Sequence, residues 1–324
     1  MNMICGRLRN RGLLTLSGKD SLSFLQGLTS TDVSSLTKNI KKIFPTLFLG
    51  SDGRILSDGL LSRDGERILL ETASGNIPTL SNLIARRKVS AKVDYSIEKN
   101  YSVNAYIPKE LLHLIRNGPQ GDTVSNTSLQ PPDYECDMPI LARKYIAYDA
   151  TNQYRDITEP YRLYLTLNGF ALPLPKEVKT LKLLPQDMFL HRMGLVAQNK
   201  GCYVGQEIMN RVMIGTLTHK YHMNFVIRRD HFENCRIAQK IPSFLETTKL
   251  YRILAEKYGA HDAHSIMCQI LNEVTEETPN EEVQSKHPVV IYYTNGLGLV
   301  LIPRRGSEGN AVLINGQDHK AFPL

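Results

Sequence analysis

Apolar residues in this chain of 324 residues occur only in short runs. The longest runs, residues 289–293 and 297–302, have the length of a β-strand. A membrane-spanning helix needs ~20 predominantly apolar residues in succession, so the sequence predicts a soluble protein with no transmembrane helix. With 42% hydrophobic and 22% charged residues, the composition is that of a globular protein rather than a disordered or fibrous one.

The length and a change of pattern along the chain predict two domains. Helix-like and strand-like segments alternate through about residue 218, and strands dominate afterwards. We therefore expect an α+β body at 1–218, made of two interleaved subdomains with a loop near 118–137. The second domain, 219–324, is expected to be mostly β with a helical insert near 243–285.

Local signals predict several elements of the body. Helical spacing of apolar residues appears at 20–28 and 78–84. Arg63-Asp64-Gly65 separates two apolar runs and predicts a hairpin, while 89–97 and 101–107 alternate like two paired strands. Thr158 is expected to cap a helix that has a proline in its first turn.

Charge and cysteine content narrow the classes of partner and compartment. The net charge of +7 comes from small basic clusters without interleaved aromatic residues, which argues against nucleic acid and fits a solvated surface, an anionic ligand or an acidic protein. The five cysteines are scattered and include no CxxC pair, so we expect a reducing compartment. Because no secretory signal precedes the first predicted strand, we expect a cytoplasmic protein, with the mitochondrial matrix as the alternative.

The most informative segment is 198–211, which reads Gln-Asn-Lys-Gly-Cys-Tyr-Val-Gly-Gln-Glu-Ile-Met-Asn-Arg. Gly201 and Gly205 bracket a tight loop, and the spacing predicts a helix that begins at Gln206. The loop is neither a Walker loop nor a dinucleotide fingerprint, because GK[ST] and GxGxxG are both absent.

This loop places Lys200 and the thiol of Cys202 near a helix N-terminus, where anions and the thiolate form are favoured. Glu207 and Arg211 are expected to form an i,i+4 pair on one face of that helix. On spacing alone, a functional thiol and a buried structural thiol both stay open for Cys202.

The run from Lys200 to Glu207 resembles the signature of the YgfZ-type folate-binding proteins, which are assembly factors for iron–sulfur proteins. These are related in fold to the glycine-cleavage aminomethyltransferase, or T-protein. The resemblance covers residues 13–220 well and the remainder loosely. It is supported by further segments at 24–32, 53–58, 161–163 and 184–187, which read Phe-Leu-Gln-Gly-Leu-Thr-Ser-Thr-Asp, Gly-Arg-Ile-Leu-Ser-Asp, Tyr-Arg-Leu and Leu-Pro-Gln-Asp.

The resemblance implies a ring of α+β subdomains around a central cavity that binds tetrahydrofolate, followed by a C-terminal β-barrel. It implies a role in the maturation of [4Fe–4S] proteins, with Cys202 and Lys200 at the functional centre. One cysteine supplies one thiolate, so a transient iron–sulfur cluster ligand or a redox-active thiol is expected rather than a permanently held cluster. The expected partners are iron–sulfur client or carrier proteins and folate, and we expect a monomer.

The folate-binding residues implied by the resemblance lie inside and outside the motif. They are Asp32, Asp58, Arg162, Tyr164, Gly201, Tyr203, Gln206, Glu207 and Arg211. In the T-protein relatives a glutamate after an Arg-Leu pair clamps the pterin ring, because a carboxylate accepts two parallel N–H bonds. Here Tyr164 follows that pair, so Glu159 or Glu207 would have to replace the clamp, or folate binds weakly or not at all.

Two aspartates have alternative readings. Asp58 matches the aspartate that takes or orients a proton beside the folate nitrogen in the aminomethyltransferase, or it caps a turn at a strand end. Asp32 is either a helix-end cap or a ligand contact.

Two histidine pairs are expected to be structural rather than metal-binding. His219 and His222 would face opposite sides of a strand. His261 and His264 lack a third ligand. No metal site is therefore predicted.

Three functions stay open. The favoured one is a tetrahydrofolate-binding assembly factor for [4Fe–4S] proteins, a binding and maturation protein rather than a turnover enzyme. The alternative is an aminomethyltransferase that transfers a one-carbon unit to tetrahydrofolate. The third is a scaffold that has lost folate binding.

Overall fold

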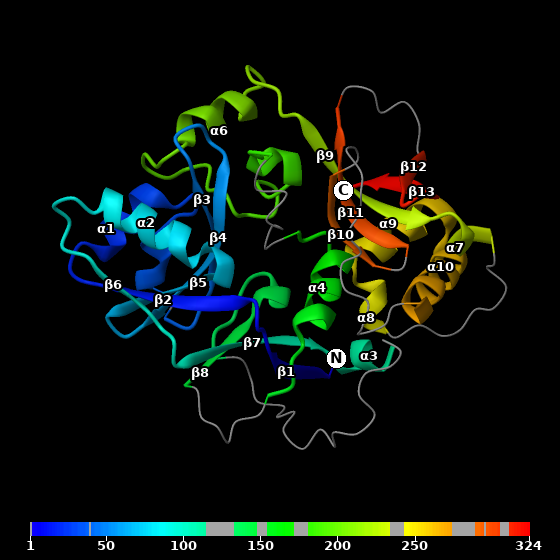
Figure 1. Cartoon of the computed structure of the whole chain (residues 1–324), viewed down its shortest axis with the longest axis horizontal. Helices are drawn as coiled ribbons and strands as arrows, with labels where there is room; N and C mark the ends of the chain where they lie inside the picture. The colour runs from blue at the N-terminus through cyan, green and yellow to red at the C-terminus, as the bar shows by residue number, and fades with distance from the viewer. Residues whose placement is uncertain are drawn as a thin grey trace.

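The computed structural model describes residues 2–38, 40–114, 133–147, 154–171, 181–233, 243–273, 289–294, 296–304 and 311–324. Within these residues three antiparallel sheets and the helices around them form two lobes (Figure 1). The predicted loop at 118–137 and the end of the predicted helical insert lie largely outside the described residues.

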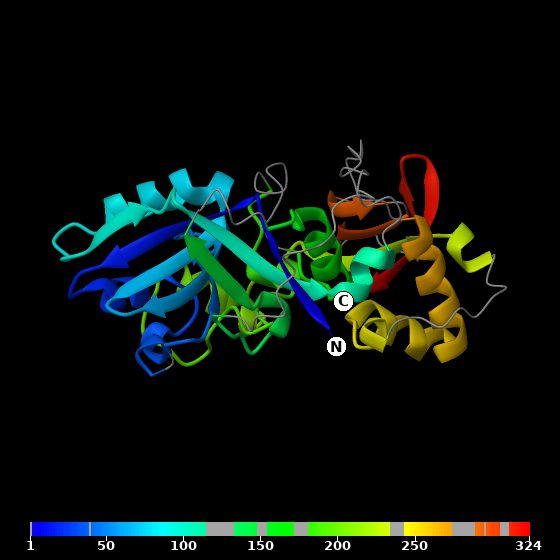
Figure 2. The same ribbon diagram turned by 90° about the horizontal axis from the view of Figure 1, so that it is seen from below.

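The first lobe is built on a five-stranded sheet of order β3-β4-β5-β2-β6. Its strands are β2 (Arg11–Ser17), β3 (Phe44–Leu49), β4 (Ile55–Asp64), β5 (Arg67–Ala73) and β6 (Asp94–Ile97). Because side chains alternate along a strand, Leu14 and Leu16 of β2 face a separate apolar core. Helices α1 (Ser21–Leu28) and α2 (Ile77–Arg87) close this core. Helix α2, in cyan, lies along one face of the sheet (Figure 2).

A three-stranded sheet of order β1-β7-β8 continues the first lobe. It consists of β1 (Met3–Arg7), β7 (Tyr101–Pro108) and β8 (Arg143–Ala147). The second lobe holds the sheet β10-β11-β9-β13-β12, which curls as a half-barrel. Its strands are β9 (Tyr221–Arg228), β10 (Val289–Thr294), β11 (Leu297–Pro303), β12 (Ala311–Ile314) and β13 (Gln317–Pro323).

Helices fill the space beside and between these sheets. They are α3 (Lys109–Leu114), α4 (Thr158–Leu167), α6 (Gln206–Met213), α7 (Asp230–Glu233), α8 (Ser243–Glu246), α9 (Lys249–Tyr258) and α10 (Ala260–Glu273). Short 3-10 turns lie at Val33–Thr37, Ser74–Asn76, Pro139–Leu141 and Pro185–Met188. Helix α4 runs between the two lobes (Figure 1) and is buried almost all round, so it belongs to the large core that both lobes share.

A single carboxylate joins the turn at Pro185–Met188 to the start of the C-terminal sheet. Asp187 is fully buried, and its Oδ1 accepts the backbone N–H groups of Lys220 at 2.8 Å and Tyr221 at 2.9 Å. Its Oδ2 accepts the N–H of Leu184 at 2.8 Å. Each of these bonds is charge-assisted, so Asp187 fixes where β9 begins relative to the body.

The α+β fold class is confirmed, and so are several local predictions. The hairpin forms between β4 and β5, with Gly65 at φ 58°. The pairing of the strands near 89–97 and 101–107 was predicted wrongly, because β6 pairs with β2, whereas β7 pairs with β1 and β8. Ile157, rather than Thr158, is the N-cap of α4.

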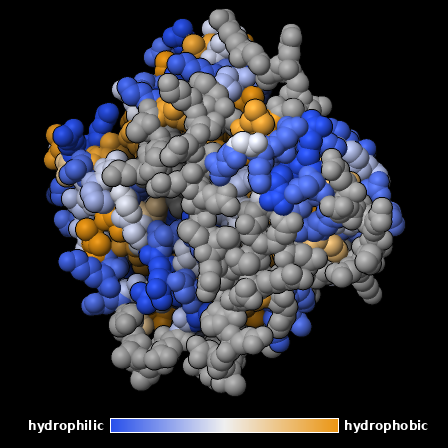
Figure 3. Space-filling view, turned by 45° about the vertical axis from the view of Figure 1, so that its right-hand side comes forward, coloured by the Kyte–Doolittle hydropathy of each residue, from blue (hydrophilic) through white to orange (hydrophobic). Residues whose placement is uncertain are grey.

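None of the described helices is long and apolar enough to cross a membrane. The face shown in Figure 3 mixes hydrophilic side chains with small hydrophobic patches. Large apolar side chains exposed in the described part of the chain are scattered over it: Ile40, Val89, Ile97, Tyr101, Met213, Ile214 and Leu313.

Candidate functional site

The cysteine loop, residues 200–205, is positioned by a glycine at its end. Gly205 has φ 85° and immediately precedes α6, which begins at Gln206 as predicted. A Cβ atom at Gly205 would lie 2.6 Å from the carbonyl oxygen of Gly50. Only glycine combines this backbone conformation with so close an approach, so the sequence itself fixes the loop against the turn before β4.

Lys200 fastens the other end of the cysteine loop. Its Nζ donates hydrogen bonds to the carbonyl oxygens of Thr29 at 2.6 Å and Thr31 at 2.8 Å. The same ammonium lies 4.9 Å from the centre of the Tyr203 ring, in cation–π range. The backbone N–H of Val204 donates to Gly27 at 3.0 Å. The loop is therefore held on both sides of Cys202 by the segment at the end of α1.

Cys202 itself is exposed between these anchors. Of the other cysteines that the structure describes, Cys5 is buried and Cys136 and Cys268 are half-buried. Tyr203 is buried beside the exposed thiol. Of the two readings left open by the sequence, the buried structural thiol is excluded, and the loop displays the sulfur to solvent.

Electrostatics link Lys200 to Asp32. Burial lowers the pKa of Lys200 to about 8, and the nearby Asp32 carboxylate opposes this. Asp32 is the N-cap of the 3-10 turn Val33–Thr37, where its Oδ1 accepts the N–H of Ser34 at 2.9 Å and the amide of Gln26 at 3.0 Å. The bond from Ser34 is the main cause of the lowered pKa of Asp32. Asp32 is thus a cap, as one of its two readings had it, but it caps the start of the following turn, whereas Thr29 caps the end of α1.

The remaining residues of the motif lie on α6, with Gln206 and Glu207 in its first turn and Arg211 in its last. The Oε1 of Gln206 accepts the backbone N–H of Tyr203 at 3.4 Å. Glu207 and Arg211 are both exposed. The predicted ion pair between these two is not formed in the described structure, because solvated long side chains gain little from such a contact.

A central cavity lies between the sheet of the first lobe and α4. Its polar lining includes Arg11, Asp58, Arg143, Tyr161 and Arg162. Its volume is about 20 Å³, which is room for roughly one water molecule.

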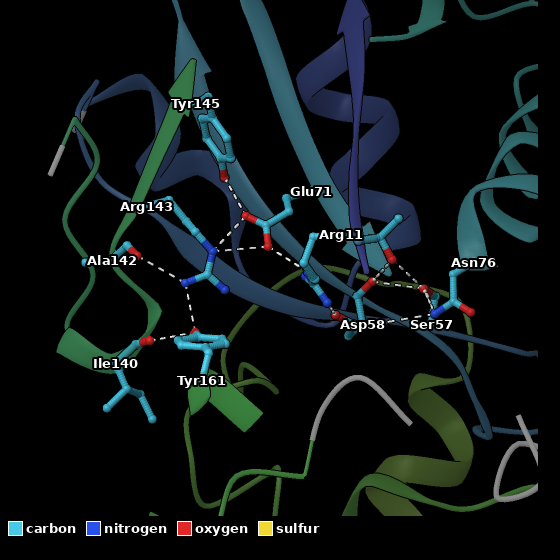
Figure 4. A network of polar contacts seen from close by, with 11 residues as sticks. Arg11, Ser57, Asp58, Glu71, Asn76, Ile140, Ala142, Arg143, Tyr145 and Tyr161 are labelled. Carbon is cyan, nitrogen blue, oxygen red and sulfur yellow. Dashed lines mark hydrogen bonds and ion pairs between the residues drawn. The ribbon is translucent and has the colours of Figure 1, made fainter. Parts of the chain in front are cut away.

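Glu71 is the centre of a buried polar network beside this cavity (Figure 4). Its Oε1 accepts from Arg11 Nε at 2.7 Å, and its Oε2 accepts from Arg143 Nε at 2.9 Å and the hydroxyl of Tyr145 at 3.0 Å. Burial would raise the pKa of Glu71, but the two guanidinium groups outweigh it and hold that pKa below its usual value. Glu71 is therefore ionised and fully committed to groups of this chain.

Asp58 extends the same network. Its Oδ2 forms a buried ion pair with Arg11, and its Oδ1 accepts from Asn76 Nδ2 at 3.4 Å. On the other side, Arg143 donates to the hydroxyl of Tyr161 at 2.8 Å. Asp58 lies inside β4, so the reading of Asp58 as a turn cap is wrong. Two carboxylates and two guanidinium groups balance one another in charge.

The residues around the central cavity do not fit a pteridine. A pterin clamp needs a carboxylate with two free acceptor oxygens. The carboxylate of Asp58 is already paired with Arg11, and that of Glu71 with Arg11 and Arg143. The cavity volume of about 20 Å³ is also far below that of small-molecule sites, roughly 300 Å³ and above.

Arg162 and Tyr164 take different positions on α4. Arg162 lines the central cavity, pairs with Glu159 at 3.3 Å and lies 5.1 Å from the centre of the Tyr292 ring. Tyr164 packs in the large core, and burial raises its pKa to about 12. Tyr164 is not among the residues that line the central cavity.

The predicted residues therefore fall into separate groups. The cysteine loop and Asp32 lie together at the ends of α1 and α6, whereas Asp58 and Arg162 line the central cavity. The structure adds Arg11, Glu71 and Arg143, which the sequence analysis missed. A signal was present for Glu71, because a charged residue directly after the apolar run at 68–70 must find a buried partner.

The histidine pairs do not assemble a metal site. His219 and His222 are in edge contact with ring centres 5.0 Å apart, not on opposite faces, because β9 begins only at Tyr221. His264 pairs with Glu246. Among the residues that the structure describes, no group of three or more His, Cys, Asp or Glu could hold a metal ion.

Known proteins that are similar in sequence to this chain share one name. The chain is 27% identical over 226 residues to "Iron-sulfur cluster assembly factor IBA57 homolog, mitochondrial" of Mycosarcoma maydis, which covers 63% of this chain and 52% of that protein. It is 26% identical over 235 residues to the protein of the same name from Pyricularia oryzae, covering 69% and 57%. The chain thus spans about half the length of the curated relatives it matches. No protein-family model matches it.

Among solved structures, the chain resembles the glycine cleavage system aminomethyltransferase T from Bartonella henselae. The TM-score is 0.58 at 12% sequence identity, and the match covers 99% of this chain and 85% of that chain. At this identity the match shows the fold alone. The resemblance predicted from the motifs is confirmed: the chain is similar in sequence to proteins named IBA57 iron–sulfur cluster assembly factors, and it has the T-protein fold.

Proposed function

We propose that this protein acts in the assembly of iron–sulfur proteins, with Cys202 as the point of contact with the cluster. The observation that carries the proposal is the exposure of this one thiol between two anchored flanks, in a chain whose relatives are named assembly factors. An exposed, positioned thiol can approach a metal bound to another protein.

A single cysteine provides only one of the ligands that an iron–sulfur cluster needs. The remaining ligands would come from the partner, an iron–sulfur carrier or client protein. The cluster is then cargo held between two chains for the duration of the transfer. This accounts for a site built on one thiol rather than on a cysteine cage.

Lys200 has a positioning role in this proposal. Its ammonium is turned to the carbonyl oxygens of Thr29 and Thr31, so it holds the loop in place. Cys202 would provide the bond to iron, and Lys200 would keep that sulfur in a fixed location.

Tetrahydrofolate binding stays a prediction of the family resemblance. The central cavity does not support it, since its carboxylates are occupied by Arg11 and Arg143. We therefore propose a mechanism that does not pass through folate. Calorimetric titration of the full chain with tetrahydrofolate tests this part separately from the role of Cys202.

The relatives are named mitochondrial, and we extend this location to the protein as a proposal. The expected cytoplasmic location gains no support from them. Fractionation of cells that express the natural protein, probed with an antibody against it, distinguishes the two compartments.

The decisive experiment compares Cys202→Ala with Cys268→Ala in cells that lack the native protein. We expect Cys202→Ala to lower the activity of [4Fe–4S] enzymes to the level of the deletion, while both variants fold normally by circular dichroism. Cys268 lies half-buried on α10 and serves as the matched control. Full enzyme activity with Cys202→Ala would refute the proposal.

The aminomethyltransferase alternative rests on a shared fold, and no residue of the candidate site adds support to it. The match to the Bartonella henselae enzyme shows the fold alone. Asp58, the residue expected to handle a proton, is paired with Arg11. Formation of methylene-tetrahydrofolate from aminomethyl-lipoyl carrier protein would revive this alternative.

A further inference from the structure

The largest cavity among those described lies away from the cysteine loop, at the hairpin between β4 and β5. We name it the hairpin cavity, and its volume is about 400 Å³. This is within the range of small-molecule sites, roughly 300–1,000 Å³. It is lined by Leu13, Thr15, Ile40, Lys41, Arg63, Asp64, Arg67, Leu69, Glu98, Tyr101, Asp133, Tyr134 and Tyr145.

Aromatic rings and exposed apolar side chains form one part of the lining. Tyr134 and Tyr145 have ring centres 5.3 Å apart, tilted by 49°. Tyr101 is 37% exposed and Ile40 is 59% exposed, so two of the scattered exposed apolar side chains gather at this one cavity. Such surfaces favour a flat aromatic ring, which gains from stacking and from leaving water.

Some of the charged side chains that line the cavity form ion pairs with other residues, and others do not. Asp64 pairs with Arg67 at 2.6 Å, and Asp133 lies 3.7 Å from Lys144. Among the residues that the structure describes, none forms an ion pair with the side chain of Lys41. The ion pair of Arg63 is a 3.6 Å contact with Glu66, which is 96% exposed. Arg63 also donates from Nε to the carbonyl oxygen of Gly65 at 2.8 Å, so only its terminal nitrogens are left to a ligand. Lys41 therefore stays available to an anionic group, with Arg63 beside it, and the nearby acids Asp64 and Asp133 are each paired with a cation.

Glu98 provides a polar acceptor on the same wall. Its Oε1 accepts the hydroxyl groups of Thr15 at 2.9 Å and Ser96 at 3.2 Å. Both bonds use the same oxygen, so Oε2 keeps the capacity to accept an N–H group of a ligand. A carboxylate fixed in this way suits an amino group on a heteroaromatic ring.

From this lining we propose that the hairpin cavity binds an amino-substituted heteroaromatic compound that carries an anionic group. The ring would lie against the tyrosines and donate to Glu98, and Lys41 and Arg63 would bind the phosphate or carboxylate. This site is separate from the proposed role of Cys202 and does not depend on it.

The hairpin cavity and the cysteine loop lie at opposite ends of β4. The cavity includes Arg63 and Asp64, near the end of the strand, whereas α6 packs against Gly53, before its start. A strand of ten residues separates them by about 30 Å. A ligand in the cavity would therefore not touch Cys202.

The test titrates the full chain with two probes of this chemistry, adenosine monophosphate and adenosine 5′-carboxylic acid, by calorimetry. The first carries a phosphate and the second a carboxylate on the same aminopurine nucleoside, so the two arms distinguish the anionic group. We expect one probe or both to bind with a stoichiometry of one. We expect Tyr101→Ala and Arg63→Gln each to weaken that binding by about tenfold or more.

Two control variants show whether a loss of binding is specific to the hairpin cavity. Arg86→Gln and Arg87→Gln each remove an exposed cation of α2 outside the cavity. We expect both controls to bind like the wild type. The proposal is overturned if neither probe binds below about 1 mM, if both cavity variants bind as tightly as the wild type, or if either control weakens binding as much as they do.

Discussion

The side-chain nitrogen of Lys200 donates a 2.6 Å hydrogen bond to the backbone carbonyl oxygen of Thr29, which ties the cysteine loop to the end of α1. The two residues are separated by 171 positions in the sequence. Because a carbonyl oxygen is an obligatory acceptor that must be satisfied when buried, the bond serves both partners.

Replacing Lys200 by methionine keeps the length of the side chain but removes the donor. We expect Lys200→Met to lower the free energy of unfolding by about 1–3 kcal/mol, since buried acceptors lose their partner. Urea unfolding followed by far-UV circular dichroism measures this, because the chain has no tryptophan for fluorescence. Lys257→Met, at the end of α9, is the control. An equal loss in both variants would contradict the anchoring role.

The stability contributed by Lys200 is expected to depend on pH. Its pKa falls from 10.5 to about 8 on folding. Between these values the unfolded chain binds more protons than the folded chain, so the free energy of unfolding rises with pH. The difference between wild type and Lys200→Met should therefore be larger near pH 9 than near pH 7. A difference that shrinks over this interval would argue against the buried amine.

Glu71→Gln is expected to destabilise the protein by about 3–5 kcal/mol, because it leaves Arg11 and Arg143 without their shared counter-charge. Glu66→Gln, whose side chain is 96% exposed, is the matched control and should change little. The measurement is the urea midpoint of each variant. A small effect at Glu71 would mean that water replaces its carboxylate.

The same residue predicts sensitivity to acid. The folded pKa of Glu71 lies below its ordinary value of 4.5. Its contribution is complete above pH 4.5 and is lost as the pH falls through the folded pKa. Wild type should therefore lose more stability than Glu71→Gln as the pH is lowered below about 4.5, which acid titrations of both proteins can compare.

Gly205→Ala and Gly201→Ala form a matched pair in one loop. At Gly205 the φ of 85° and the approach to the Gly50 oxygen oppose any side chain, and we expect a loss of about 1–3 kcal/mol. At Gly201 a Cβ meets no atom within 4 Å, so alanine should be tolerated. Thermal unfolding compares them, and equal melting temperatures would contradict the predicted strain.

Asp187→Asn tests the joint between the turn at Pro185–Met188 and β9. An amide nitrogen cannot accept the N–H groups that Asp187 binds, so we expect a loss of about 2–3 kcal/mol. Asp94→Asn on the edge strand β6 provides an exposed comparison. If the two variants unfold at the same urea concentration, the joint contributes nothing.

Elements governed by neighbouring residues could be predicted from the sequence. The helix from Gln206 and the hairpin with Gly65 follow from local spacing and from glycine geometry. In each of these cases the determining contacts lie within a few positions.

Pairing between distant segments could not be predicted in the same way. Arg143 and Glu71 are 72 positions apart in the sequence, and the residues around either of them do not indicate that the two side chains pair. The strand β1 was missed because it is defined by its pairing with β7. The closure of the central cavity depends on these long-range pairs, so the expected folate site could be checked only in three dimensions.

The ten residues of β4 act as a spacer of fixed length between the thiol and the hairpin cavity. A metabolite in that cavity and a carrier protein docked at Cys202 would not compete for room. Both could occupy the molecule at once, so under the proposed function a metabolite that inhibited cluster delivery would do so noncompetitively.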